Sequence, residues 1–302
     1  MTRFWLVLLL LVGGTSPADV VGRFDVEGPP VLFEPGIVST ERSEVKLTFA
    51  PDGRRMLWGT IGWPGGAGGW DIWESVREGG HWGKPHPATF NSPENDFDPS
   101  FAADGRGLYF FSNRPGGLGG DDIYYVGFDR EANAYGEPVN LGPNVNSAGD
   151  EWGPVVSPDG TRLLVSTNGR AGQGKHDLFV SRKQGGHWSA LANLGSDVNS
   201  PLEDFDAAFL DADGTIVFAS GNLENGPVAL RVSFVTTAGY SKPIDPGEAV
   251  NSATFINFGC ATNPREPGVL YFTSNFKGNA LGKADIYRVR YRLTRQPSRE
   301  AR

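Results

Sequence analysis

Short apolar runs separated by polar turns recur along most of the chain. Five of these runs occupy residues 55–58, 108–111, 163–166, 216–219 and 270–273. Each run follows a turn that carries Asp-Gly, or Pro-Gly in the fifth copy. Consecutive turn glycines lie 52 to 55 residues apart, at Gly53, Gly105, Gly160, Gly214 and Gly268. Asp-Gly between two apolar runs is typical of a β-hairpin, because glycine accepts the positive φ that the turn requires. This regular spacing predicts one structural unit repeated five times.

Each repeat contains the pattern of four strands. One strand precedes the Asp-Gly turn and one follows it; a Gly-rich loop then leads to a third strand, at residues 71–73, 122–124, 177–179, 228–230 and 285–287. A fourth strand is expected to end in Asn-Ser, as at Asn91-Ser92 and Asn146-Ser147. One such sheet cannot bury both of its faces, whereas a ring of sheets can. We therefore expect an all-β fold, a five-bladed β-propeller of four-stranded antiparallel blades.

The two ends of the repeat region complement each other. The last repeat, residues 252–291, has only three predicted strands, and residues 34–40 match 141–147 in Gly/Pro content, valine and terminal hydroxyl. Residues 34–40 are therefore expected to supply the missing fourth strand, which closes the ring and covers two open sheet edges. The propeller is expected to span residues 31–292, after an N-terminal extension at 19–30 and before a disordered polar tail at 293–302.

The second repeat resembles the TolB-type β-propeller family, a WD-repeat-like group with a Pro-Asp-Gly repeat. The residues that carry this resemblance are Asp104-Gly105, Ser112-Asn113-Arg114, Gly116-Gly117, Gly119-Gly120 and Asp122-Ile123-Tyr124. The resemblance extends over residues 31–292 and implies the propeller fold. Members of this family serve as periplasmic binding proteins, as adaptor modules of cell-envelope complexes and occasionally within enzymes, so the resemblance implies no single activity.

The N-terminus has the pattern of an export signal. Arg3 precedes an unbroken apolar run at residues 4–12, which is too short to span a bilayer, and Ser16-Pro17-Ala18 supplies small residues for cleavage. We expect a signal peptide at 1–18 and a periplasmic or secreted product without membrane insertion; an uncleaved anchor is the alternative. The lone Cys260 allows no internal disulfide. The net charge of −8 disfavours nucleic acid and anionic membrane surfaces as partners, and we expect a monomer.

A carboxylate recurs near the start of each first strand. It lies four residues after the terminal hydroxyl of the preceding repeat, at Glu44, Asp96, Glu151 and Asp204, with Ile256 in the fifth position. Two residues further, at the same strand parity, are Lys46, Asp98, Gly153, Asp206 and Phe258. Because the first strand of a propeller blade is innermost, the four carboxylates are expected at the mouth of the central funnel, on the face we call the top. Lys46, Asp98 and Asp206 are expected to lie deeper, as a mixed-charge set.

Two classes of function follow from these acids. As an enzyme, a glycoside hydrolase or polysaccharide lyase, the protein would use Asp96, Asp98, Asp204, Asp206, Glu44 or Glu151, since separated carboxylates divide the acid and base roles of glycoside cleavage. As scaffold, a repeated acid caps a blade junction by accepting backbone N–H groups. A residue that recurs once per repeat is more often scaffold. We therefore favour a non-catalytic propeller that binds a protein or glycan partner through its top face.

Other residues of the top loops are candidates for ligand binding. An exposed tryptophan beside carboxylates suits sugar stacking, and a basic residue suits an anionic group, which indicates Lys46, Trp63, Arg114, Trp152 and Arg170. Packing between blades is the favoured interpretation for Trp152 and an equal alternative for Trp63. No cofactor or zinc site is expected from one cysteine and four histidines. The repeated aspartates that open the third strands suit calcium, although hydrogen bonding to the loop is the favoured interpretation.

Overall fold

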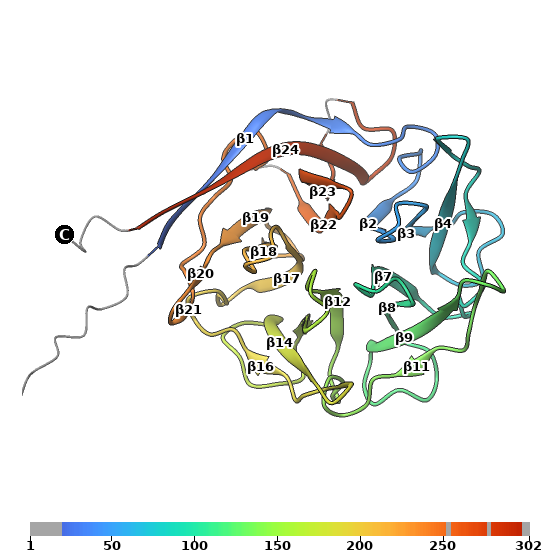
Figure 1. Cartoon of the computed structure of the whole chain (residues 1–302), viewed down its shortest axis with the longest axis horizontal. Coiled ribbons are helices and arrows are strands. Elements are labelled where there is room, and N and C mark those ends of the chain that lie inside the picture. The colour runs from blue at the N-terminus through green and yellow to red at the C-terminus, as the bar shows by residue number, and fades with distance from the viewer. Residues whose placement is uncertain (1–19, 252–254, 277–278, 298–302) are drawn as a thin grey trace, which may run out of the picture.

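The protein is a ring of five β-sheets around a central axis (Figure 1). The computed structural model describes residues 20–251, 255–276 and 279–297, and its regular elements there are all strands. No helix of these residues is long and apolar enough to cross a membrane. The expectation of an all-β five-bladed propeller is confirmed. The proposed signal peptide at 1–18 lies outside the described residues and stays a prediction.

Every blade contains three long antiparallel strands in chain order from the axis outward. The innermost strands are β2 (Glu44–Phe49), β7 (Asp96–Phe101), β12 (Glu151–Val156), β17 (Glu203–Phe209) and β22 (Asn257–Asn263). The second strands are β3 (Arg55–Ile61), β8 (Gly107–Ser112), β13 (Arg162–Thr167), β18 (Ile216–Gly221) and β23 (Glu266–Ser274). The third strands are β4 (Trp70–Glu78), β9 (Asp122–Asp129), β14 (Asp177–Gln184), β19 (Val228–Ser233) and β24 (Asp285–Pro297).

The outer edge of the first three blades is split into two short strands that pair with the third strand. These are β5 (His81–Trp82) with β6 (His86–Pro87), β10 (Ala134–Tyr135) with β11 (Val139–Asn140), and β15 (His187–Trp188) with β16 (Ala192–Asn193). In the fourth blade β20 (Val235–Thr236) and β21 (Gly239–Tyr240) pair only with each other.

The Asn-Ser pairs lie in the loop after the outer strands, which corrects the prediction that they end a fourth strand. The asparagine side chain takes over the strand's hydrogen bonding. Oδ1 of Asn146 accepts the N–H of Ile123 at 2.8 Å, and its Nδ2 donates to the C=O of Ile123 at 2.9 Å. Asn91, Asn199 and Asn251 do the same in their blades. A side-chain amide carries both a donor and an acceptor, so it can replace a backbone residue in the ladder.

The ring is closed by the N-terminal strand, as predicted, but by different residues. β1 (Val20–Leu32) pairs antiparallel with β24, from Val20 opposite Pro297 to Leu32 opposite Tyr287 (Figure 1). The expected extension at 19–30 therefore belongs largely to the closing strand, and the expected disordered tail is β-strand as far as Pro297. Residues 34–40 form the loop that follows the closing strand, where Ser39 replaces the amide of Asn146: its Oγ accepts the N–H of Ile286 at 3.2 Å and donates to its C=O at 3.1 Å.

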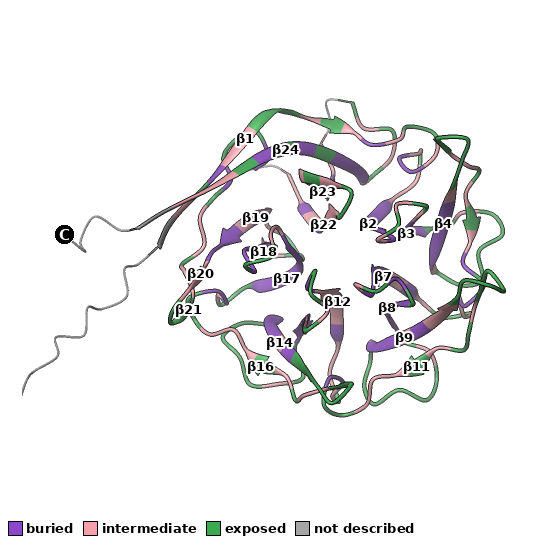
Figure 2. Ribbon diagram, in the orientation of Figure 1, coloured by how far each residue is buried: buried purple, intermediate pink, exposed green. Residues whose placement is uncertain are grey.

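The core lies between neighbouring blades, in sections that each join two sheets. The second strands are buried almost throughout, while the outer loops are exposed (Figure 2). The largest side chains with less than 2% exposure include Trp58, Phe110, Phe218, Tyr271 and Tyr287. Each buried aromatic contributes about 1.5–3 kcal/mol of stabilisation, so the stiff ring holds the innermost strands in fixed positions around the axis.

Candidate functional site

Four of the predicted funnel acids are buried anchors of the blade junctions. Their side chains have no exposure, and each accepts a hydrogen bond from the backbone N–H four residues earlier, at 3.1 Å for Glu44 and 2.8 Å for Glu151. The full set is Glu44, Asp96, Glu151 and Asp204. These hydrogen bonds hold the loop that enters each innermost strand. A carboxylate without exposure does not reach a substrate, so this geometry is that of a junction cap.

The fifth junction differs from the predicted alignment by one residue. Asn257 pairs with Ser274, in the register in which Glu44 pairs with Thr60, so Asn257 rather than Ile256 occupies the anchor position. Its Nδ2 donates to the C=O of Val250 at 3.2 Å. The connection into this blade is one residue longer than the others, and the simple count from the terminal hydroxyl therefore fails here.

Three of the predicted ligand-binding residues are engaged in the scaffold. Nη2 of Arg114 lies 2.6 Å from Oδ1 of Asp96, and Arg170 donates to four backbone carbonyls at residues 143–146. Trp63 stacks on Trp73 with ring centroids 4.4 Å apart and packs on the core. The structure therefore places none of Trp63, Arg114 and Arg170 at the axis.

Burial gives one anchor a pH-dependent role in stability. Burial raises the pKa of Glu44 from 4.5 to about 7, against the opposing hydrogen bonds from Thr40. The folded state therefore favours the protonated acid, and stability present below about pH 4.5 is lost as the pH rises through about 7. We expect the free energy of unfolding of the native protein to fall, relative to that of Glu44→Gln, by up to about 3 kcal/mol across this window. Urea denaturation of both proteins at the two ends of the window measures the difference; equal pH profiles would contradict it.

A ring of five residues with positive φ surrounds the axis. Each lies at the register shift of an innermost strand, and the set is Lys46 (φ 47°), Asp98 (53°), Gly153 (54°), Asp206 (50°) and Gly259 (61°). Gly259 thus holds the position that the alignment gave to Phe258. The left-handed conformation costs a residue with a Cβ about 1–2 kcal/mol. Three such residues in one ring concentrate strain and charge at the axis, as functional sites commonly do.

The three side chains of this ring, Lys46, Asp98 and Asp206, form a buried mixed-charge group that we call the axial cluster. Nζ of Lys46, which is 2% exposed, reaches the C=O of Ala207 in the fourth blade at 3.1 Å. Oδ2 of Asp206 accepts the N–H of Gly259 at 2.9 Å, and the Asp98 carboxyl lies near that of Asp206. Burial and the neighbouring Asp206 carboxyl raise the pKa of Asp98 well above its usual range, and the Lys46 ammonium opposes them.

Above the axial cluster, on the face of the Gly-rich loops, lies a cavity of about 250 Å³ that we call the upper axial pocket. Its walls are mainly aromatic, from Trp70, Phe97, Phe111, Trp152, Phe205 and Phe258, with Val45 and Leu223. Its only acidic lining residues are Asp98, Asp206 and Asp121. The structure thus brings Asp98, Asp206 and Trp152 of the predicted residues together in one pocket.

Sequence reasoning missed Asp121, Phe97, Phe111 and Phe205 of the pocket lining, although one signal was present. The residue after each junction anchor is large and apolar in every blade, as Val45, Phe97, Trp152, Phe205 and Phe258. Nε1 of Trp152 donates to Oδ2 of Asp121 at 2.8 Å. The Trp152 ring stacks on the His176 ring, with ring centroids 3.7 Å apart. His176 in turn lies 2.7 Å from Glu203. These contacts fix one wall of the pocket in place.

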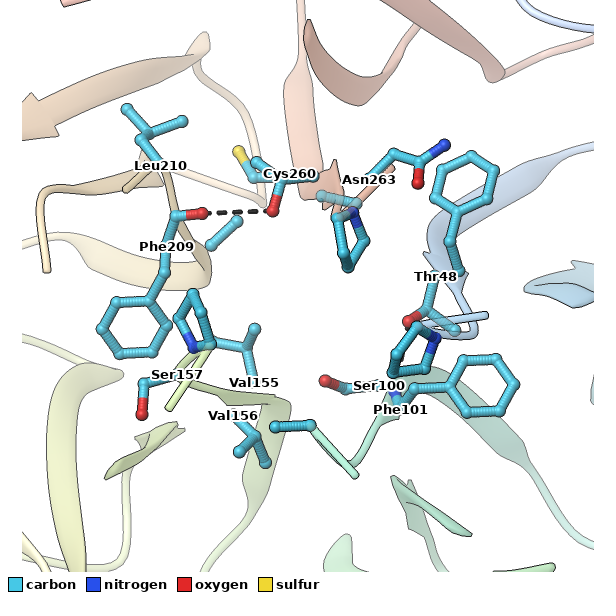
Figure 3. Close-up of a pocket in the computed structure, with 18 of the residues that line it drawn as sticks. Thr48, Ser100, Phe101, Val155, Val156, Ser157, Phe209, Leu210, Cys260 and Asn263 are labelled. Carbon is cyan, nitrogen blue, oxygen red and sulfur yellow. Dashed lines mark hydrogen bonds between the residues drawn. The ribbon is translucent and has the colours of Figure 1, made fainter. Parts of the chain in front are cut away.

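A second cavity of about 320 Å³ lies on the opposite side of the axial cluster (Figure 3). The side chains labelled there are mostly short, apolar or hydroxyl-bearing, and come from all five innermost strands or the turns after them. Its hydroxyls serve the scaffold: Thr262 donates to the C=O of Phe209, and Thr48 accepts the N–H of Phe101, both at 3.1 Å. Burial raises the pKa of the Cys260 thiol to about 12, so it is no nucleophile at neutral pH.

The third-strand aspartates, for which calcium was the alternative interpretation, accept hydrogen bonds from their own Gly-rich loops. Asp71 accepts the N–H groups of Ala67 and Gly68, both at 3.1 Å, and Asp285 those of Leu281 and Gly282, both at 3.0 Å. Asp122 and Asp177 have equivalent contacts. Within residues 20–251, 255–276 and 279–297, no three His, Cys, Asp or Glu side chains are grouped to hold a metal ion.

Comparison with known proteins finds similarity of fold. No model of a protein family and no curated protein sequence matches the chain. Similar solved structures include TolB from Acinetobacter baumannii, with 14% identity, 85% of this chain and 58% of TolB covered, and a TM-score of 0.48. The Hadza microbial sialidase Hz136 has 12% identity, with 78% of this chain and 53% of the sialidase covered and a TM-score of 0.45. The α-L-arabinofuranosidase PaAbf62A from Podospora anserina has 11% identity, with 91% and 97% covered and a TM-score of 0.48. The chain thus spans little more than half the length of TolB and of the sialidase.

Proposed function

We propose that this protein is a non-catalytic propeller, acting in the periplasm or outside the cell, that receives a projecting group of a protein or glycan partner in the upper axial pocket. The observation that carries this proposal is the pocket itself. It combines aromatic walls with buried carboxyls at the axis of a rigid ring, and ligand sites are typically apolar cavities with a few convergent polar groups.

The burial of the two deepest acids supports binding over glycoside cleavage. A glycosidase holds its two carboxyls about 5 Å apart, or about 6.5–9.5 Å apart when a water molecule must fit between them. In the axial cluster Asp98 and Asp206 are 5% and 3% exposed, and they lie close enough for the Asp206 carboxyl to raise the pKa of Asp98. Acids buried this deeply are poorly placed to stand on either side of a sugar bond.

A panel of soluble polysaccharides and unstructured peptides tests this function. We expect at least one member to bind, measured by affinity electrophoresis or calorimetry, without any new reducing or unsaturated chain ends. Replacing Trp152 by alanine removes a pocket wall and is expected to weaken binding about tenfold or more, since one aromatic contact contributes about 0.5–1.5 kcal/mol beyond its buried area. The control is Trp82→Ala, because Trp82 lies in the outer strand β5, away from the pocket.

Two outcomes would count against this function. Chain ends produced by the native protein but not by Asp98→Asn/Asp206→Asn would show hydrolase or lyase activity in the funnel. Binding that Trp152→Ala leaves unchanged would place the partner elsewhere on the surface.

A further inference from the structure

The lining of the upper axial pocket has one chemical property that narrows its ligand. Acceptors are supplied by three carboxyls, Asp98, Asp121 and Asp206, whereas the only side-chain N–H donors of the lining are those of Trp70 and Trp152. The Trp152 donor is already used by Asp121. The lining therefore offers few hydrogen-bond donors to an anion or to a ligand rich in acceptors. It offers three carboxyl acceptors to a positively charged donor.

One carboxyl oxygen at the floor has no donor. Oδ1 of Asp206 is buried and accepts no hydrogen bond from a protein N–H, and the whole residue is 3% exposed. Gly153 faces it, where a Cβ would come within 2.7 Å of that oxygen. A buried acceptor without a donor is costly. A bound cation would satisfy it.

The aromatic walls suit the same kind of ligand. The ring centroids of Trp70 and Phe97, which stack, are 5.4 Å apart, and those of Phe97 and Phe111 are 4.0 Å apart. The ring centroids of Phe205 and Phe258 are 6.4 Å apart. A ring face attracts an ammonium group through its quadrupole, most strongly when the group has lost its water. Apolar walls also favour an ammonium that carries carbon substituents over a small hydrated metal ion.

We infer that the upper axial pocket binds an organic ammonium group, held by the aromatic walls and by the Asp98, Asp121 and Asp206 carboxyls. The inference rests on the proposed function and names the group that the partner inserts. An ammonium occurs on a lysine side chain, on an amino sugar and on quaternary amines, and about 250 Å³ accommodates any one of these head groups. Lys46 does not fill this place, because its Nζ turns to the C=O of Ala207 and its side chain lines the opposite cavity.

Ammonium binding is expected to release a proton. The charged groups around Asp98 are Asp206, Lys46 and Asp121, and burial keeps Asp98 protonated above the usual range of an aspartate pKa. A cation in the pocket favours the ionised carboxyl, so Asp98 loses its proton as the ligand enters. Affinity therefore rises with pH, and the apparent heat of binding depends on the ionisation enthalpy of the buffer.

Calorimetric titration of the purified protein tests the inference with matched probes. The probes are choline against its neutral isostere 3,3-dimethylbutan-1-ol, glucosamine against N-acetylglucosamine, and Nα-acetyl-lysine methylamide against Nα-acetyl-norleucine methylamide. We expect at least one cation to bind about tenfold or more tightly than its neutral counterpart. The pair with the largest ratio identifies the source of the ammonium group.

Variants separate the pocket from general charge effects. Asp206→Asn and Asp98→Asn are each expected to weaken the preferred cation about tenfold or more, while Asp197→Asn removes an exposed acid outside the pocket and leaves affinity unchanged. Equal affinity for every cation and its neutral counterpart, or no loss in either pocket variant, overturns the inference. If the cations fail while a neutral polysaccharide or a lysine-free peptide binds in a Trp152-dependent way, the ammonium inference fails and the proposed function stands.

Discussion

Replacing Phe24 with alanine is expected to lower the free energy of unfolding by about 3–5 kcal/mol, the loss typical of a buried phenylalanine. Phe24 is 6% exposed and stacks on Tyr291 of β24 with ring centroids 4.9 Å apart. It belongs to the core section that joins the fourth and fifth blades. The residue lies near the N-terminal end of the closing strand, so a large loss would show that ring closure extends this far. Urea denaturation monitored by circular dichroism measures it.

The neighbouring residue supplies the control. The Arg23 side chain is 69% exposed and forms a surface ion pair with Asp25. Surface pairs contribute about 0–1 kcal/mol, so Arg23→Ala should be close to neutral. A loss below about 1 kcal/mol for Phe24→Ala would mean that β1 is not part of the cooperative core.

Lys46→Met is expected to cost about 3–5 kcal/mol at slightly alkaline pH and clearly less at about pH 5. Removing one partner from a buried charge group leaves the others uncompensated, which is strongly destabilising. Here the ammonium opposes the carboxyl charge of Asp98 and Asp206 at the axis. Lower pH neutralises that charge and so reduces the loss. Methionine keeps the length of the apolar stem, so the measurement isolates the charge. Denaturation at both pH values reports the difference.

A double variant makes the interpretation specific. Lys46→Met/Asp206→Asn removes a negative charge together with the positive one and should recover part of the stability at alkaline pH. If the single variant loses the same free energy at both pH values, or the double variant recovers nothing, then Lys46 acts through packing of its stem alone.

Local sequence signals were sufficient to predict the strands and turns of each blade. The glycines of the Asp-Gly turns include Gly53, Gly105 and Gly160, and each has the positive φ that the sequence pattern predicts. These turns join strands that are neighbours in the chain, so the order of strands within a blade follows from local geometry. The junction acids are local too, since each accepts a hydrogen bond from the residue four positions earlier, and that spacing is readable in the sequence.

Ring closure was predictable in outline but not in detail. The Gly/Pro similarity of residues 34–40 correctly indicated that the N-terminus completes the fifth blade. It did not indicate which residues form the strand, because β1 pairs with β24 across more than 250 residues of chain and no turn sequence connects them. Only the alternation of buried residues on both strands, such as Phe24 and Tyr291, sets that register.

The amino-acid sequence by itself determined the repeat, the number of blades and four of the five junction anchors, because each depends on residues close together in the chain. The sequence also indicated that Lys46, Asp98 and Asp206 lie inside the funnel, but only the tertiary structure decided that they form one buried cluster below an aromatic pocket. Lys46, Asp98 and Asp206 are turned to positive φ by bulges in crowded innermost strands, a conformation that their residue types do not signal. The pocket wall likewise takes single side chains such as Phe97, Trp152 and Phe205 from separate blades. These residues acquire a common environment only when the closed ring brings them to one axis.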